Sequence, residues 1–203
     1  MKNMTNKNRK NVTDIEILGI LSHIDKNCKH HKEQIRMMVV CSMNGMRSIN
    51  FRYLQVKNCY DPDTGAVKDK ICLDSDKNKG KFPATYWVNE QFATELAKYY
   101  KYLKTRWGDK LGPDTYLFTS QKMNKPYNRV SVCRIFHDVY NGCGCKDCCT
   151  HWGRRLFVTR LCRKGADICL IKRLVNHKSI ATTQAYYNYD DESLKNAAKL
   201  AAF

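Results

Sequence analysis

The sequence predicts an α+β fold that is mainly α-helical and contains one small antiparallel β-sheet. Apolar residues recur at helical spacing through most of the chain, whereas the segment near residues 70–88 shows two short β-type runs separated by a polar turn. The chain has 203 residues, of which 43% are hydrophobic. This is enough to bury one core, so we expect a single compact domain.

The first eleven residues predict a flexible basic arm. They carry four basic residues and no acidic one, and they offer little apolar surface to bury. We expect the folded domain to cover residues 12–203. Its first helix is predicted to begin near Asp14, because Thr13 to Glu16 have the Thr-x-x-Glu pattern of a capping box.

A second helix is predicted over roughly residues 32–43. It should end at Asn44-Gly45, two residue types that tolerate the left-handed backbone of a helix end, and Arg47 follows directly. A β-hairpin is predicted next. Residues 71–73 and 84–88 form its strands, and the polar residues 76–80 form its turn.

The rest of the chain predicts helices. Two longer ones run from about Phe92 to near Gly108 and from about Val130 to Gly142, and three shorter ones cover about 152–164, 167–175 and 182–188. The Ala- and Leu-rich tail, about 192–203, is also expected to be helical. Tyrosines alternate with lysines over residues 98–104, which suits either stacking on DNA or packing of a helical stripe.

The net charge indicates a polyanionic partner. Lys and Arg total 36 against 19 Asp and Glu, which gives +17. Nucleic acid is the first candidate. A membrane is disfavoured, because no apolar run approaches spanning length and no secretory leader opens the chain. We therefore expect a soluble, intracellular protein.

Four of the eleven cysteines crowd into one short stretch, as Cys143, Cys145, Cys148 and Cys149. The odd total and the lack of a leader favour reduced thiols over disulfides. The Cys145-x-x-Cys148 spacing is typical of zinc ligands, but no distant second half completes a tetrahedral site. We therefore favour reduced thiols in a loop, with a zinc site as the alternative.

The residues with the clearest chemical meaning lie between positions 151 and 186. His151 and Arg154 are three residues apart on a predicted helix, so both side chains can reach one phosphate. Downstream, the run Leu-Val-Asn-His-Lys-Ser-Ile-Ala-Thr-Thr-Gln-Ala-Tyr contains His177 and Tyr186. In a purely structural interpretation, His177 would be a cap and Tyr186 a core aromatic.

This stretch resembles the C-terminal signature of the tyrosine recombinases (phage integrase family), in which a Leu-Leu-Gly-His turn leads into Thr-Thr-Gln-x-Tyr. The resemblance covers residues 151–186 without a gap. It also assigns the family's first arginine to Arg47, since Asn-Gly-Met-Arg stands here in place of Thr-Gly-Leu-Arg. The family usually has Glu three residues later, Asp-Leu after the first His and Gly before the second. This chain has Asn50, Trp152-Gly153 and Asn176 there.

The resemblance implies a lysine in the hairpin turn. Lys77, Lys79 and Lys81 are the candidates, and counting back from Trp87-Val88 favours Lys79. The other two, together with Arg155 and Lys178, are expected to contact DNA.

The resemblance implies cleavage and rejoining of DNA strands through a 3′-phosphotyrosine at Tyr186. Arg47, Arg154 and His177 would stabilise the charge that develops on the phosphate. His151 would accept the tyrosine proton, and Lys79 would protonate the departing 5′ oxygen. No metal or nucleotide cofactor is required.

The resemblance further implies double-stranded DNA and copies of the same chain as partners. Four protomers would assemble on two DNA sites, with the C-terminal helix, about 192–203, packed on a neighbouring subunit. Such a DNA-integrating enzyme of a mobile element would act in a bacterial cytoplasm and nucleoid, or in the host cell if it is virus-encoded. Family members commonly carry an N-terminal DNA-clamping domain, so this chain is either a truncated form or a short invertase-like member.

Two other functions fit the same residues. A type IB topoisomerase shares the chemistry on a related fold, but would relax supercoils as a monomer. A DNA-binding regulator that has lost catalysis is the non-enzymatic alternative, and the complete residue set argues against it.

Overall fold

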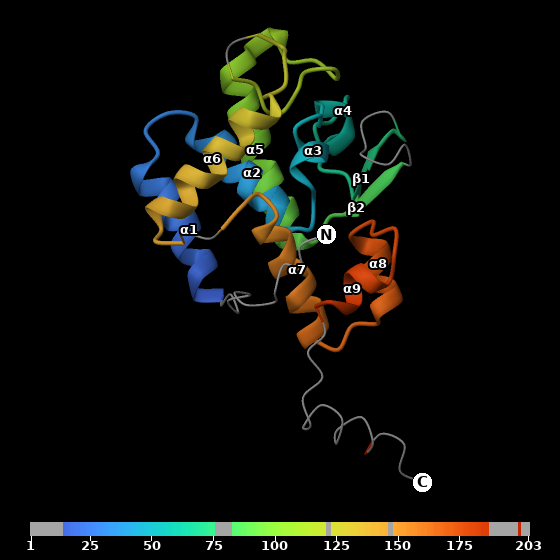
Figure 1. Ribbon diagram of the computed structural model, residues 1–203. Coiled ribbons are helices and arrows are strands. Elements are labelled where there is room, and N and C mark those ends of the chain that lie inside the picture. The colour runs from blue at the N-terminus through green and yellow to red at the C-terminus, as the bar shows by residue number, and fades with distance from the viewer. Residues whose placement is uncertain (1–13, 76–82, 121–122, 146–147, 187–198, 200–203) are drawn as a thin grey trace.

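The computed structural model describes residues 14–75, 83–120, 123–145, 148–186 and Lys199, and it has a mainly helical architecture with one two-stranded sheet (Figure 1). The predicted α+β class is confirmed. The basic arm 1–11, the hairpin turn and the tail 192–203, apart from Lys199, lie outside the described residues.

The longer helices are α1 (Asp14–Asn27), α2 (Lys32–Met43), α5 (Glu90–Trp107), α6 (Arg129–Gly142) and α7 (Trp152–Arg163). Helices α2 and α5 run through the middle, with α1 and α6 on one side (Figure 1). Two short helices, α3 (Ser48–Phe51) and α4 (Val56–Cys59), lie on the other side next to the strands. Below these follow α8 (Ile168–Leu174) and α9 (Ala181–Gln184).

The predicted hairpin strands are confirmed as β1 (Lys70–Leu73) and β2 (Ala84–Trp87). They pair antiparallel, with Ile71 opposite Tyr86 and Cys72 opposite Thr85. Side chains alternate along a strand, so Ile71 and Tyr86 are buried while Cys72 is exposed. The sheet therefore carries Tyr86 into the interior.

Most helix limits agree with the sequence, but three short elements differ. Helices α3 and α4 were not predicted, because four residues are too few to show a 3.6-residue period. Helix α9 was predicted over 182–188, but it spans Ala181–Gln184. The Tyr186 amide donates to the Thr183 carbonyl (3.0 Å), so the backbone tightens into a turn at this point.

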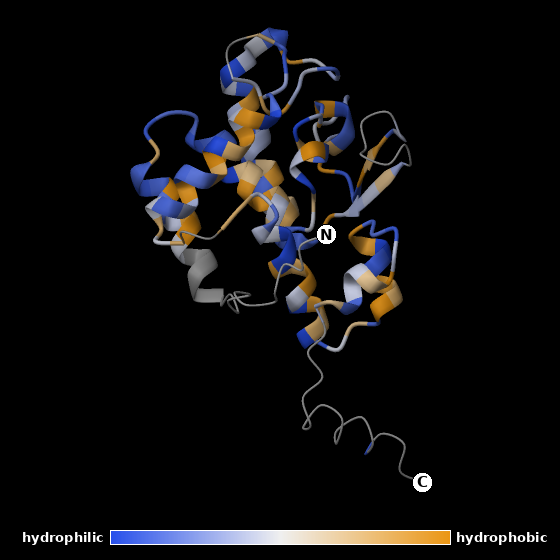
Figure 2. Ribbon diagram, viewed as in Figure 1, coloured by the Kyte–Doolittle hydropathy of each residue, from blue (hydrophilic) through white to orange (hydrophobic). Residues whose placement is uncertain are grey.

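Hydrophobic residues are concentrated on the ribbon where the helices meet around α2 (Figure 2). The main core includes Met38, Phe51, Phe118 and Phe136, all fully buried. A smaller cluster of Val158, Ile171 and Val175 joins α7 to α8, and the Tyr186 side chain packs against its edge. This smaller cluster fixes the C-terminal helices relative to each other.

The tyrosines of α5 pack against the core, Tyr99 buried within it and Tyr100 and Tyr102 partly buried at its edge. Tyr99 is 4% exposed and its hydroxyl donates to the Leu117 carbonyl. The Tyr100 ring lies 4.6 Å from that of Tyr60, measured between centroids. Packing therefore accounts for these rings, and the alternative of stacking on DNA is not needed.

Helices α2 and α7 approach closely at Gly153. A Cβ atom at this position would lie 2.7 Å from Ser42 Oγ and 3.0 Å from the Met43 backbone nitrogen. The Ser42 hydroxyl also donates to the Thr150 carbonyl at 3.2 Å. The replacement of the family's Leu by Gly therefore has a packing reason, and the contact fixes α7 on α2.

Replacing Gly153 with alanine is expected to destabilise the fold by about 1–3 kcal/mol, because the methyl group overpacks this crossing. Chemical denaturation measures the loss. Gly19→Ala is the matched control, since nothing lies within 4 Å of its added Cβ and it sits inside α1. That control should be neutral or stabilising. Equal stability of the two variants would contradict the close-contact interpretation.

In the part of the chain that the structure describes, no helix is long and apolar enough to cross a membrane.

Candidate active site

Among the predicted site residues that the structure describes, Arg154 is the most deeply buried cation, at 4% exposure. Its guanidinium donates to the carbonyls of Gly45, just after α2, and Val175, just after α8. It is also hydrogen-bonded to the Tyr86 hydroxyl of β2. Burial and the nearby Arg47 lower the pKa of Arg154 to about 10, so it remains cationic at neutral pH.

Arg47 lies at the N-cap of α3 and donates from Nη2 to the Asn176 carbonyl at 2.8 Å. Asn176 itself has a φ of 53°, in the left-handed region. Asparagine tolerates this conformation better than most residues, so it can replace the family's glycine here. Its side chain also donates to the Thr85 carbonyl at 3.0 Å, which ties this turn to β2.

His177 lies beside Tyr186, with ring centroids 6.5 Å apart and planes 18° apart. Its Nδ1 is 2.9 Å from Thr183 Oγ1, and Thr183 is fully buried at the start of the final turn. Partial burial, followed by the charges of Arg154 and Arg47, lowers the pKa of His177 to about 4. The imidazole is therefore neutral at neutral pH.

Tyr186 is half-buried in the turn after α9. It packs on the Val158, Ile171 and Val175 cluster, and it lies near enough to Arg154 for a charge on its oxygen to raise the pKa of that guanidinium. The structure thus brings Arg47, Arg154, His177 and Tyr186 together, although they come from opposite ends of the chain.

The other predicted site residues are either exposed or lie outside the described residues. His151 is exposed at the N-cap of α7, three residues before Arg154 along the chain, with Nδ1 3.4 Å from Thr150 Oγ1. Arg155 and Lys178 are exposed. Lys77, Lys79 and Lys81 lie outside the described residues, between the two confirmed strands, so the choice of Lys79 stays a prediction.

Comparison with known proteins identifies the family. The model of the phage integrase family matches residues 10–193. The chain belongs to the phage integrase family. The resemblance to tyrosine recombinases that rested on residues 151–186 is thereby confirmed.

Two named relatives are consistent with this family assignment. It is 27% identical over 134 residues to the probable integrase/recombinase YoeC of Bacillus subtilis (strain 168), covering 66% of this chain and 70% of that one. It is 28% identical over 123 residues to tyrosine recombinase XerA of Pyrococcus furiosus, covering 61% of this chain and 41% of that one.

Solved structures share the fold. The XerA recombinase structure superimposes with a TM-score of 0.69 at 21% identity, covering 95% of this chain and 65% of that one. The XerH recombinase bound to its difH substrate before cleavage gives 0.71 at 20% identity, covering 98% and 56%. The chain therefore spans less than two thirds of the length of these two structures.

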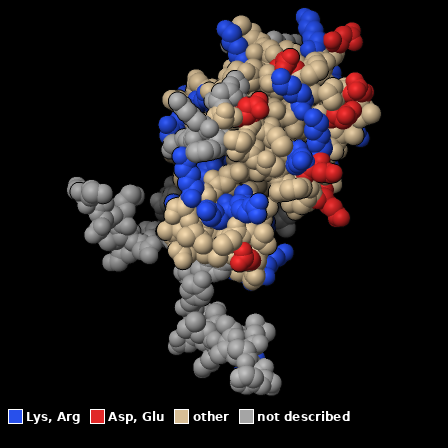
Figure 3. All heavy atoms as spheres, turned by 90° about the vertical axis from the view of Figure 1, so that its right-hand side faces the viewer, with Lys and Arg blue, Asp and Glu red and all other residues tan. Residues whose placement is uncertain are grey.

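Basic residues are dense in the C-terminal helices of this family member. Residues 152–186 contain one acidic residue, Asp167, and eight basic ones: Arg154, Arg155, Arg160, Arg163, Lys164, Lys172, Arg173 and Lys178. Figure 3 views the side of the protein on which the hairpin and α8 lie. Basic side chains are spread over this face, with a group across its lower half, whereas most of the acidic ones lie along one edge beside further basic ones.

The cysteine-rich loop connects α6 to α7 directly before His151. Cys143, Cys145 and Cys148 are half-buried and Cys149 is exposed. Partial burial, with Cys145 nearby, raises the pKa of Cys143 to about 11, which favours the protonated thiol. Among the described residues, no three His, Cys, Asp or Glu side chains are grouped so as to hold a metal ion. The zinc alternative therefore gains no support from these residues.

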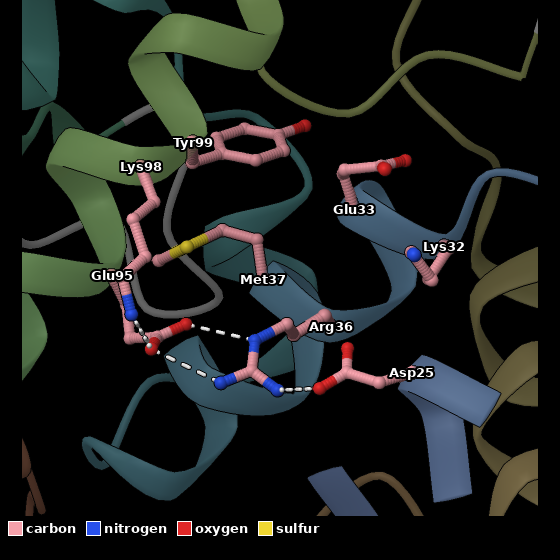
Figure 4. A pocket seen from close by; sticks show the side chains of 8 residues that line it. All are labelled: Asp25, Lys32, Glu33, Arg36, Met37, Glu95, Lys98 and Tyr99. Atoms are coloured by element: carbon pink, nitrogen blue, oxygen red, sulfur yellow. Dashed lines mark hydrogen bonds and ion pairs between the residues drawn. The ribbon is translucent and has the colours of Figure 1, made fainter. Parts of the chain in front are cut away.

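A separate pocket lies between α1, α2 and α5 (Figure 4). Arg36 lies between two carboxylates there, donating to Glu95 at 2.9 and 3.0 Å and to Asp25 at 2.8 Å. These ion pairs join three helices. None of the predicted site residues lines the pocket, so we assign it a structural role.

His177 is expected to make stability depend on pH. Its folded pKa of about 4 lies below the ordinary 6.5, so the unfolded chain binds the proton more readily between these values. The contribution is present above about pH 6.5 and is lost as the pH falls toward 4. The free energy of unfolding, measured by chemical denaturation, should fall more between about pH 7.5 and about pH 5 for the wild type than for His177→Gln. An equal dependence of the unfolding free energy on pH in the two proteins would contradict the lowered pKa of His177.

Proposed function

We propose that this chain is the catalytic part of a site-specific DNA recombinase or integrase that forms a 3′-phosphotyrosyl bond through Tyr186. The observation that carries the proposal is the convergence of Arg47, Arg154 and His177 around a half-buried tyrosine in this fold. The names of the relatives support it, because they are integrases and recombinases and one structural neighbour, XerH, is bound to a DNA substrate.

In the proposed reaction, the Tyr186 oxygen attacks the scissile phosphorus while the bond from phosphorus to the 5′ oxygen breaks. His151 takes the tyrosine proton and Lys79 gives a proton to the 5′ oxygen. The extra negative charge of the transition state is stabilised by the two guanidinium groups, which donate to phosphate as rigid forks. None of these steps requires a metal or nucleotide cofactor.

Neutral His177 would donate one hydrogen bond to a non-bridging phosphate oxygen. When the Thr183 hydroxyl donates to Nδ1, the ring proton resides on Nε2, on the far side of the ring from Thr183. We propose that the Thr183 hydroxyl is the donor in this 2.9 Å contact and thereby selects the tautomer. Sequence reasoning did not assign it this role, although the Thr-Thr-Gln motif quoted for the resemblance contains it.

The decisive experiment is capture of the covalent intermediate. The protein is incubated with a pool of nicked duplexes of varied sequence, in which the released end diffuses away and cleavage cannot reverse. Mass spectrometry should then find a DNA adduct on Tyr186. A silent DNA-binding regulator would give no adduct. A type IB topoisomerase would give one but would also relax supercoiled plasmid as a monomer.

We also propose the setting of the reaction. Double-stranded DNA is the substrate, and four copies assemble on two sites, with the segment 192–203 packed on a neighbouring copy. The reaction takes place in a bacterial cytoplasm and nucleoid, or in an infected host cell. Mass measurement of the complex on DNA tests the assembly.

DNA affinity is expected to fall steeply with salt. The net charge is +17, and the C-terminal helices contain eight basic residues against one acidic residue. If six or more phosphates are contacted, the binding constant should drop by roughly 10³-fold or more between about 50 and 200 mM salt. Fluorescence anisotropy with labelled duplex measures this. A flat response would contradict DNA as the main partner.

A further inference from the structure

Tyr86 lies next to the candidate active site, and no catalytic role was assigned to it from the sequence. It is 1% exposed on β2. Its hydroxyl receives a hydrogen bond from Asn50 Nδ2 at 2.7 Å and is hydrogen-bonded to Arg154. These three side chains come from β2, α3 and α7, so the phenol joins three separate elements at the buried cation.

The orientation of Arg154 depends on its hydrogen-bond acceptors. Two of them are the backbone carbonyls of Gly45 and Val175, and the phenol supplies the side-chain acceptor. Within the described ranges, no ion pair joins Arg154 to a carboxylate. A planar guanidinium anchored by three acceptors is held in one orientation, which is what bidentate donation to phosphate requires.

Asn50 replaces the glutamate that the family usually has at this position, and it is fully buried. A carboxylate there would place a negative charge close to the guanidinium groups and offset part of the charge meant for phosphate. The amide orients the phenol without adding charge. The arrangement therefore leaves the positive charges of Arg47 and Arg154 without a carboxylate at position 50 to offset them.

Strand β2 is also linked to Arg47, through the side chain and carbonyl of Asn176. The Thr85 carbonyl accepts from the Asn176 side chain, and the Asn176 carbonyl accepts from Arg47. Adjacent residues of one strand are thus linked to Arg154 directly, through Tyr86, and to Arg47 through Asn176. The same strand follows the turn that contains Lys77, Lys79 and Lys81.

We propose that Tyr86 is a positioning residue that holds the Arg154 guanidinium in register with the scissile phosphate, and that Asn50 fixes Tyr86 for this purpose. The inference rests on the proposed function, because the phosphate is the substrate of that reaction. It gives Tyr86 and Asn50 a role in cleavage, and neither residue belongs to the family's signature.

The first test is Tyr86→Phe, which removes only the hydroxyl. Cleavage of a nicked duplex should slow by about 10- to 100-fold, the range for loss of one hydrogen bond to a charged group. DNA affinity should change little. Tyr60→Phe is the matched control, since it removes another fully buried hydroxyl, one that donates to the Leu96 carbonyl in the main core. Equal cleavage rates for the two variants would overturn the proposal.

A second measurement separates positioning from general damage to the fold. A methylphosphonate at the scissile position removes one negative charge from the phosphate, so the reaction depends less on an aligned guanidinium. The defect of Tyr86→Phe should shrink on this substrate, as should that of Arg154→Ala. A defect of the same size on both substrates would show that Tyr86 acts only on folding, and would overturn the inference.

Asn50 is tested by a double-mutant cycle. Asn50→Leu should reproduce the Tyr86→Phe defect. The double variant should be no slower than either single variant, because both substitutions disrupt the same chain of hydrogen bonds from Asn50 through Tyr86 to Arg154. NMR signals of the Arg154 guanidinium protons give a readout independent of cleavage. They should change in Tyr86→Phe and not in Tyr60→Phe.

If the wild type forms no adduct, the proposed function fails. If it cleaves and Tyr86→Phe matches it, only the positioning role fails.

Discussion

Replacing Tyr186 with phenylalanine is expected to abolish the covalent protein–DNA adduct and to leave DNA binding unchanged. The ring packs on the Val158, Ile171 and Val175 cluster, and phenylalanine preserves this contact. Only the attacking oxygen is lost, and without this nucleophile the covalent bond to the phosphate is not expected to form. Denaturing gels with labelled nicked DNA measure the adduct, and an electrophoretic mobility shift measures binding.

Tyr187→Phe is the control for the register of the motif. Tyr187 lies outside the described residues, so this control rests on sequence spacing, in which Tyr186 stands nine residues after His177. The control should form the adduct at the wild-type rate. An adduct peptide that maps to Tyr187, or that survives Tyr186→Phe, would show that the register is shifted by one residue.

The sequence predicted the elements whose signals are local. Asn44-Gly45 ends α2 as expected, with Gly45 at a φ of 84° and the Phe157 ring against it. The strands of the hairpin are in place on both sides of the polar turn. Glycine freedom and strand alternation are properties of a few neighbouring residues, so they can be read without knowledge of the tertiary structure.

The partners of the proposed catalytic residues were harder to predict. Tyr86 meets Asn50 and Arg154 only after three elements pack together, at separations of 36 residues or more along the chain. No periodicity encodes such a contact. The lowered pKa of His177 likewise follows first from its partial burial in the folded chain and then from the charges of Arg154 and Arg47, none of which its neighbours in the sequence reveal. The resemblance suggested which groups react, and those roles stay predictions, whereas the supporting hydrogen bonds required the structure.

Arg154→Ala and Lys79→Ala are expected to slow cleavage for different reasons. Arg154 is anchored by two carbonyls and a phenol beside Tyr186, where it can stabilise charge on the phosphate. Its loss should reduce the cleavage rate by about 10²-fold or more, as for removal of one preorganised donor. Lys79 is proposed to act on the leaving group instead, so its loss should reduce the rate on ordinary DNA as well.

Sulfur in place of the bridging 5′ oxygen distinguishes the two roles. A thiolate leaves without needing a proton, so this substrate should restore cleavage by Lys79→Ala if Lys79 is the general acid. Arg154→Ala should gain no comparable rescue, because the charge on the non-bridging oxygens is unchanged. Rescue of Lys77→Ala or Lys81→Ala, without rescue of Lys79→Ala, would move the assignment to that residue. If none of the three lysine variants is rescued, the proton comes from a group outside the hairpin.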